Sequence, residues 1–154
     1  MTLRFGTDGV RGPASDLTDA LVIALGQAAA QVLGATTFVI GRDTRESGER
    51  IANALATGLL RGDAEPLRMG VVPTPAVAWV CAQRNVPGAV ISASHNRWSD
   101  NGIKFFAAGG RKLSDELESA LESALDAVFV AEPDSSTRAA IAAADTDTDT
   151  DTDT

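Results

Sequence analysis

Three short segments of the sequence gather side chains that could do chemistry. Residues 6–12 (GTDGVRG) and 41–48 (GRDTRESG) mix glycine with hydroxyl, aspartate and arginine groups, and residues 92–96 (SASHN) hold two serines, a histidine and an asparagine. Glycine lets backbone N–H groups approach an anion, and arginine offers a planar fork of donors that suits phosphate oxygens. The segments therefore predict contacts with phosphate. Each segment alone is weak evidence for phosphate binding. Residues 41–48 are also typical of a turn with an internal salt bridge, and no Walker-type or dinucleotide fingerprint is present.

The third segment is the most informative of the three. Ser94 follows a short apolar run, has His95 and Asn96 beside it, and is followed by Lys104 a few residues later. One interpretation is a serine presented for reaction; the other is that Ser92 and Ser94 cap backbone groups. A lone His95 is a poor metal ligand, but its ring can donate hydrogen bonds to phosphate oxygens, and Lys104 could neutralise the same charge.

Hydrophobic periodicity predicts the elements that must position these segments. Helices are expected from the N-cap Thr18 to Gly34, around residues 51–59 with Gly62 as the end, from the N-cap Thr74 to about Gln83, and after the cap Ser114; strands are expected at residues 36–40, 67–72, 88–92 and 103–106. Residues 6–13 are predicted to be turns. Strands alternating with helices predict an α/β layered domain with a mixed sheet flanked by helices, and ligand sites at the strand ends.

Composition and charge narrow the range of partners. The 154 residues carry 13 Lys and Arg against 21 Asp and Glu, but five of the acids lie in the terminal Asp-Thr repeat, which leaves 16 acids against 13 bases in residues 1–144. A nearly neutral body without a basic cluster predicts that neither nucleic acid nor a membrane surface is a partner. No apolar run approaches a membrane span or a secretory signal, so a cytoplasmic location is expected. The single Cys81 lies in an apolar stretch and is expected to be a buried structural thiol.

The end of the sequence has a different character. Past Pro133 the residues become small, polar and repetitive, and five consecutive Asp-Thr pairs cannot bury enough apolar surface to offset the entropy of ordering. One domain is therefore expected over residues 1–133 and a disordered low-complexity tail over residues 134–154. The alternating aspartates have the spacing of a metal loop but no glycine turn or apolar anchor, so no metal site is predicted there.

Taken in order, the segments carry a family resemblance. The set "FGTDGVRG", "GRDTRESG", "PTPAVAW" and "ISASHN…DNGIKFF" covers roughly residues 3–130 and resembles the amino-terminal domain of the α-D-phosphohexomutase family. The forms "FGTDGVRG" and "DNGIKFF" look most like the branch that interconverts glucosamine 6-phosphate and glucosamine 1-phosphate. The resemblance therefore implies an isomerase that acts on a phosphosugar through a phosphoserine and a bisphosphate intermediate.

The resemblance also implies roles for individual residues. Ser94, and not Ser92, matches the serine that exchanges a phosphoryl group with the sugar. The match at Arg11 implies a contact to the active-site phosphate, and the match at Lys104 implies charge neutralisation around it. The resemblance further implies Mg²⁺, held by the phosphate on Ser94 and by ligands outside this chain, while a homodimer is left open as a further partner.

The sequence matches the family pattern at two further residues and departs from it in two respects. His95 and Asn96 would shape the phosphoserine loop, with Asn96 near the bound phosphate. Arg97 stands where the family usually has proline, which would have fixed φ. The metal, sugar-recognition and distal phosphate loops of the family lie in later domains. The chain is therefore expected to be a fragment that is inactive alone; the alternatives are a stand-alone phosphosugar-binding module without turnover, or a phosphomannomutase or phosphoglucomutase of the same family.

Overall fold

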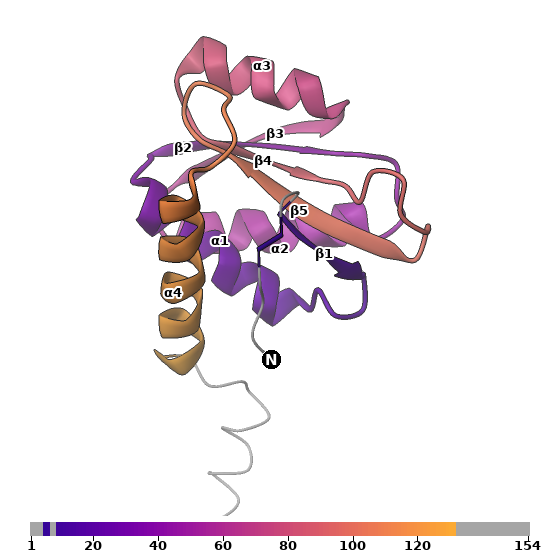
Figure 1. The fold of residues 1–154 in the computed structure, drawn as a ribbon, viewed down its shortest axis with the longest axis horizontal. Coiled ribbons are helices and arrows are strands. Elements are labelled where there is room, and N and C mark those ends of the chain that lie inside the picture. Colours follow the sequence, from indigo (N-terminus) through magenta and orange to yellow (C-terminus); the bar gives the residue numbers. More distant parts are fainter. Residues whose placement is uncertain (1–4, 7–8, 132–154) are drawn as a thin grey trace, which may run out of the picture.

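The computed structural model describes residues 5, 6 and 9–131, and Figure 1 shows their arrangement. In chain order the elements are β1 (Val10–Pro13), α1 (Asp19–Leu33), β2 (Thr37–Arg42), α2 (Gly48–Arg61), β3 (Glu65–Val71), α3 (Thr74–Arg84), β4 (Gly88–Ile91), β5 (Asp100–Phe106) and α4 (Asp115–Ala131). The predicted boundary at residue 133 and the tail at 134–154 lie outside the described residues. Within the described part, no helix is long and apolar enough to cross a membrane.

The described strands form one mixed sheet in the order β1-β5-β4-β2-β3. Strand β2 runs parallel to both β3 and β4, whereas β5 runs antiparallel to β4 and to β1. Helices α1, α2 and α4 lie on one face of the sheet, and α3 lies on the other (Figure 1). The predicted α/β layered architecture with a mixed sheet and flanking helices is therefore confirmed.

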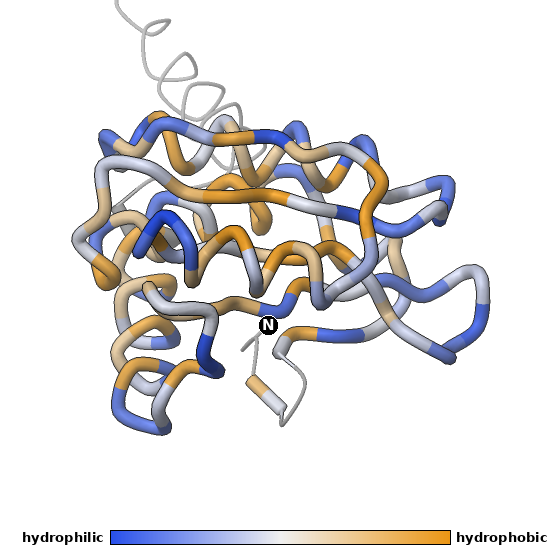
Figure 2. Tube along the Cα trace, turned by 90° about the horizontal axis from the view of Figure 1, so that it is seen from above, coloured by the Kyte–Doolittle hydropathy of each residue, from blue (hydrophilic) through white to orange (hydrophobic). Residues whose placement is uncertain are grey.

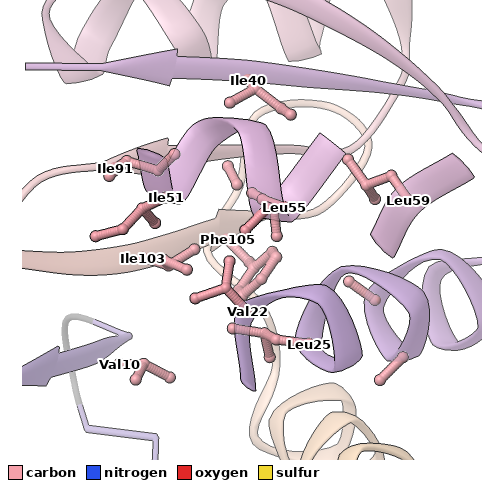
Figure 3. Packing of buried hydrophobic residues seen from close by; sticks show 14 of the residues in the cluster. Val10, Val22, Leu25, Ile40, Ile51, Leu55, Leu59, Ile91, Ile103 and Phe105 are labelled. Carbon is pink, nitrogen blue, oxygen red and sulfur yellow. The ribbon is translucent and has the colours of Figure 1, made fainter. Parts of the chain in front are cut away.

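The larger core fills the space between the sheet and α1, α2 and α4. Alternate strand residues point to this side, because successive side chains of a strand face opposite ways. Figure 3 shows Ile40, Ile91 and Ile103 from three strands beside Ile51 and Leu55 of α2, all fully or almost fully buried. Figure 2 shows the same pattern along the chain, with hydrophobic stretches in the middle of the domain and hydrophilic turns at its periphery. Among the described residues this face of the sheet is consequently an apolar core, with the buried Asn101 at its edge bonded to Ser47 Oγ at 2.8 Å.

A smaller apolar cluster lies between the sheet and α3. It is formed by Val39, Val77, Cys81, Val90 and Phe106. The Cys81 side chain is completely buried, and this burial raises the pKa of its thiol to about 11. The sequence-based expectation of a buried structural thiol is confirmed.

The helix ends show why these segments are helical. Thr18 Oγ1 accepts a hydrogen bond from the Leu21 N–H at 3.2 Å, and Gly34 ends the same helix in the left-handed conformation with φ of 60°. Ser114 Oγ accepts from the Leu117 N–H at 3.2 Å, as predicted for a cap. The prediction for Thr74 is wrong in detail, because Thr74 is the first helical residue and Pro73 occupies the cap position without a side-chain hydrogen bond.

Strand boundaries differ most from the sequence prediction around β1 and β5. Residues 10–13 form a strand, although they were expected to be turns, and β5 begins at Asp100 instead of residue 103. The two differences have one cause, since β1 pairs with the early part of β5 from Val10 opposite Ile103 to Pro13 opposite Asp100. Four residues that read Val-Arg-Gly-Pro carry no periodic signal, so only the pairing with a distant partner makes them a strand.

Candidate functional site

The site lies at the carboxyl end of β4, on the face of the sheet that carries α3. A pocket of about 340 Å³ opens there, and its lining is Arg11, Thr74, Val90, Ser92, Ser94, His95 and Lys104. Four of the predicted site residues therefore share one pocket, although they come from β1, β5 and the loop after β4. The fifth, Asn96, is joined to them through a contact with Arg11 at 3.5 Å. Thr74, at the start of α3, is a lining residue that the sequence analysis did not single out as part of the site.

Strand register explains how residues so far apart in sequence meet. Lys104 lies opposite Val90 in the β4–β5 pair, and Arg11 lies opposite Gly102 in the β1–β5 pair. Residues 102 and 104 are two apart and thus share a face of β5. A Cβ atom on Gly102 would lie 2.9 Å from the Ser92 carbonyl oxygen and 3.2 Å from Arg11 Cγ. The absence of a side chain at Gly102 is what lets Arg11 and the end of β4 approach each other.

Ser94 sits on a strained part of the loop that follows β4. Its φ of 54° lies in the left-handed region, which costs a non-glycine residue about 1–2 kcal/mol. Ser92 Oγ accepts a hydrogen bond from the Ser94 N–H at 3.0 Å, so Ser92 does cap the backbone. Ser94 itself lines the pocket and stays exposed, with its Oγ 3.3 Å from Nδ1 of His95. The two serines thus have different environments, which the sequence pattern alone left open.

The cationic groups of the pocket differ in how they are held. Lys104 is half-buried, and its Nζ lies 5.5 Å from the centroid of the Phe106 ring. Among the described residues no acidic side chain pairs with Lys104 or Arg11. Arg11 Nε is buried and has no hydrogen-bond partner within the described part of the chain. Two positive charges without an acidic partner there make the pocket suited to an anion.

The segment at residues 41–48 does not face the pocket as a phosphate-binding loop. Its Arg45 forms a salt bridge with Asp43, with Nε 3.2 Å from Oδ2, and directs its other donors to backbone carbonyl groups of residues 94–100. Arg42 donates to the Asp43 carbonyl at 3.3 Å. Of the two interpretations of this segment, the turn with an internal salt bridge is the one that the structure shows. Sequence reasoning missed that Arg45 serves the Ser94 loop, because nothing in the local pattern connects residues about 50 positions apart.

Comparison with known proteins shows the family of the chain. Residues 2–130 match the family model described as phosphoglucomutase/phosphomannomutase, alpha/beta/alpha domain I. The chain belongs to this family. The structure described as a putative phosphomannomutase from Thermus thermophilus superposes with a TM-score of 0.75 and 32% identity, covering 81% of this chain and 30% of that one.

Curated relatives of this domain I are more similar in sequence. A phosphoglucosamine mutase from Rhodococcus erythropolis is 53% identical over 130 residues, which are 79% of this chain and 29% of the relative. One from Corynebacterium efficiens is 50% identical over 136 residues, or 82% of this chain and 30% of the relative. The chain therefore spans about 30% of the length of the curated relatives it matches.

Arg97, which stands where the family usually has proline, lies in the loop between β4 and β5. Its side chain is exposed, and its described hydrogen bonds run through its carbonyl oxygen, which accepts from Arg45 Nη1 and from the Asp100 N–H. Proline possesses the same carbonyl group. Arginine at this position therefore keeps the contacts that a proline could also make, and it adds a solvated charge.

The described part of domain I does not hold a ready-made metal centre. None of its His, Cys, Asp and Glu side chains gather in a group of three or more that could bind an ion. The groups that line the pocket around Ser94 are cationic or neutral. Such a set suits a phosphate, and the oxygens of that phosphate are the atoms here that fit a hard cation such as Mg²⁺.

Proposed function

We propose that Ser94 carries the phosphoryl group of a phosphoglucosamine mutase of which this chain forms domain I. The observation that carries the proposal is the pocket in which the exposed Ser94 hydroxyl meets Arg11, Lys104 and His95. Phosphoryl transfer asks a protein mainly for positioning and for positive charge around the transferred group. A phosphoserine brings about −1.5 to −2 charges, which the two cations can balance.

The proposed reaction has two transfers. Phosphorylated Ser94 gives its phosphoryl group to the 1-hydroxyl of glucosamine 6-phosphate, so the bond from phosphorus to Oγ breaks and a bond to the sugar oxygen forms. The sugar hydroxyl loses its proton, and Ser94 regains one. The bisphosphate then gives its 6-phosphoryl group to Ser94: the bond from phosphorus to O6 breaks, a bond to Oγ forms, and the proton of the Ser94 hydroxyl passes to O6. Glucosamine 1-phosphate is released and the phosphoserine is restored.

His95 and Asn96 have supporting places in this scheme. His95 Nδ1 lies 3.3 Å from Ser94 Oγ, a distance over which the ring can exchange a proton with the hydroxyl as the phosphoryl group arrives or leaves. Asn96 accepts from Arg11 Nη1 at 3.5 Å and donates to Asp100 at 3.4 Å, and so helps to orient the Arg11 guanidinium towards the phosphate. Both residues are thus proposed to serve the phosphoserine.

Mg²⁺ is proposed as the cofactor, bound through the phosphate on Ser94. When bound, the cation would neutralise further charge on the transferring group. Its remaining ligands and the groups that select the sugar would have to come from outside the described residues. We therefore expect no mutase turnover from these 154 residues by themselves.

The glucosamine phosphates are preferred over other hexose phosphates on sequence similarity. The phosphoglucosamine mutases above are 50% and 53% identical to this chain, whereas the structure described as a putative phosphomannomutase is 32% identical. Phosphomannomutase or phosphoglucomutase activity remains the alternative within the family. Assaying glucosamine, mannose and glucose phosphates in the same preparation distinguishes these activities.

A domain exchange tests the proposal. Residues 2–130 replace the matching segment of the Rhodococcus erythropolis relative, and formation of glucosamine 1-phosphate is followed in a coupled assay while peptide mapping locates the phosphate. We expect turnover and phosphate on Ser94, both lost in Ser94→Ala. Ser123→Ala, on the exposed side of α4, is the matched control and should behave as the unaltered exchange protein. Turnover that survives Ser94→Ala, or phosphate on Ser92 instead, would overturn the assignment.

A further inference from the structure

Arg45 makes an unusual number of contacts with the loop that carries Ser94. The residue lies between β2 and α2, and its side chain is only 11% exposed. Nη2 donates to the carbonyl oxygens of Ser94 at 2.7 Å and of Asn96 at 3.1 Å. Nη1 donates to the carbonyl oxygens of Arg97 and of Asp100, the latter at 3.3 Å. One side chain therefore binds four carbonyl groups within seven residues of the loop.

Asp43 fixes the direction of this guanidinium. Its Oδ2 accepts from Arg45 Nε at 3.2 Å, and its Oδ1 accepts from the Arg45 backbone N–H at 3.1 Å. The Asp43 N–H in turn donates to the Ile91 carbonyl at the end of β4, at 3.0 Å. The base of the Arg45 side chain is thus tied to the strand from which the Ser94 loop departs.

These contacts leave Arg45 no donor for a ligand. A guanidinium has five N–H groups. Nε uses one on Asp43, and the two terminal nitrogens make four bonds to the loop carbonyls. Arg45 is also absent from the lining of the pocket that holds Ser94, Arg11 and Lys104. Its action on a phosphate would therefore be indirect.

The loop has a physical need for such a partner. Ser94 has a φ of 54°, and a strained residue keeps that conformation only when its surroundings impose it. Ser92 holds the Ser94 N–H, while Arg45 holds the Ser94 carbonyl oxygen. The peptide groups on both sides of the strained residue are consequently fixed, and with them the direction of the Cα–Cβ bond that carries the Ser94 hydroxyl.

We propose that Arg45 is a positioning residue for phosphoryl transfer, and the proposal rests on the assignment of Ser94 as the phosphorylated residue. Arg45 acts through the backbone: its planar fork gathers the four carbonyl groups and keeps Ser94 Oγ directed into the pocket. Lysine would keep the positive charge, but its single ammonium group cannot reproduce the fork. The geometry of the guanidinium, and not its charge alone, is the essential property.

Arg50 provides a matched control within the same segment of the chain. Its Nη1 donates to the Leu17 carbonyl at 2.9 Å and to Asp19 Oδ1 at 2.8 Å, and its Nη2 donates to the Ala14 carbonyl at 3.0 Å. Arg50 thus also holds loop carbonyls with the help of an aspartate, but at the loop before α1. Replacing it removes the same kind of group but no direct hydrogen bond to residues 94–100, since it is the Ala14 N–H that donates to the Ser99 carbonyl, at 2.9 Å.

The first experiment measures the order of the loop in the 154-residue chain and needs no enzymatic activity. Amide hydrogen exchange is followed by NMR at Ser94, Asn96 and Asp100, whose N–H groups are all hydrogen-bonded. Exchange there is expected to be about tenfold faster or more in Arg45→Ala and to be only partly restored in Arg45→Lys. The rates in α1 should stay the same, and Arg50→Ala should leave the three loop amides unchanged. Equal loop exchange in Arg45→Ala and the unaltered chain would overturn the proposal.

The second experiment measures transfer in the domain-exchange protein described above. Arg45→Ala is expected to lower kcat at least tenfold with a smaller change in KM, and millimolar free guanidinium should restore part of the loss. Full activity in Arg45→Lys would overturn the role of the fork, and full activity in Arg45→Ala would overturn positioning altogether. Absence of transfer in the unaltered exchange protein would instead reject the function proposed for Ser94, while hydrogen exchange would still decide whether Arg45 orders the loop.

Discussion

Ile103 and Lys104 are neighbours in β5 and have opposite surroundings. Ile103 points towards α1 and α2, where it is fully buried in the larger core. Lys104 points to the face that carries α3 and lines the pocket with Ser94. One step along a strand therefore separates a residue that holds the fold together from a residue placed for chemistry.

The difference follows from how completely each face of the sheet is covered. Helices α1, α2 and α4 cover the face of Ile103, whereas α3 is the one described helix on the other face (Figure 1). Apolar residues of α3 pack there on Val39, Val90 and Phe106. The end of β4 and the middle of β5 extend past this contact and form the pocket. Polar side chains are tolerated there because they keep access to water.

The largest contrast is expected from alanine at each of the two neighbours. In the domain-exchange protein, Lys104→Ala should lower turnover about 100-fold, because it removes a charge aimed at the transferring phosphoryl group, while stability changes by less than about 1 kcal/mol. Ile103→Ala should cost about 2–5 kcal/mol of stability through the cavity it leaves, with near-normal turnover per folded molecule. Coupled assays and denaturant melts of both variants measure the two effects.

Lys104→Arg separates charge from shape in the same experiment. A guanidinium at this position keeps a cation near Ser94, and most of the turnover should return. Should Lys104→Ala unfold the protein as readily as Ile103→Ala, with unchanged activity in the folded fraction, Lys104 would be a structural residue and the contrast between the two faces would be lost.

An intermediate effect is expected at Gly102, which lies on the same face as Lys104. A Cβ there would come within 2.7 Å of the Val10 carbonyl oxygen and 2.9 Å of the Ser92 carbonyl oxygen. Gly102→Ala should therefore push β1 and the Ser94 loop apart, at a cost of about 1–3 kcal/mol and with a smaller loss of turnover than Lys104→Ala. Gly12→Ala is the control in β1, because a Cβ at Gly12 would meet nothing within 4 Å. Equal behaviour of the two variants would show that close approach at Gly102 is unimportant.

The two faces also differ in how far the sequence could predict them. The apolar face was predictable, since Leu21, Leu25, Ile51 and Leu55 recur at helical spacing and are buried as expected. The residues of the pocket are indicated by short motifs around Ser94 and by family resemblance. The sequence predicts a turn at Arg11, because the strand that holds Arg11 forms only by pairing with β5. Hydrophobic periodicity depends only on the residues of the element itself. The pairing of β1 depends on β5, which lies about 90 residues away in the sequence and is brought next to β1 by the fold.

Arg45 illustrates the same limit within a motif. Its Asp43 partner is two residues away and could be foreseen as an internal salt bridge. The four loop carbonyls are about 50 residues away and belong to the backbone, which any sequence possesses. A side chain that binds backbone groups leaves no complementary residue type for a sequence pattern to detect.

The smallest expected effect concerns Cys81, which lies on the same side of the sheet as Lys104 but beneath the full cover of α3. Burial there raises the pKa of the thiol from 9.0 to about 11. At pH 8 the thiolate fraction is then about 100-fold lower than for an ordinary thiol, before any protection from access is counted. Iodoacetamide should leave Cys81 unmodified in the folded chain and modify it readily in denaturant, as intact mass will show. Rapid modification of the folded chain at pH 8 would mean that α3 covers this face less well than the structure indicates.

The raised pKa of the Cys81 thiol also makes the free energy of unfolding depend on pH. The folded state holds the Cys81 proton up to about pH 11, whereas the unfolded chain releases it near pH 9. The contribution to stability is therefore complete below pH 9 and is lost as the pH rises towards 11. Denaturant melts of the unaltered chain and of Cys81→Ala are compared between about pH 8 and 11. The difference between the two slopes of stability against pH measures the contribution of the thiol, because the two chains differ only at residue 81. Equal slopes of stability against pH in the two chains would show that burial does not raise the pKa of the Cys81 thiol. The contrast between the covered and open parts of this face would then rest on Lys104 and Gly102 alone.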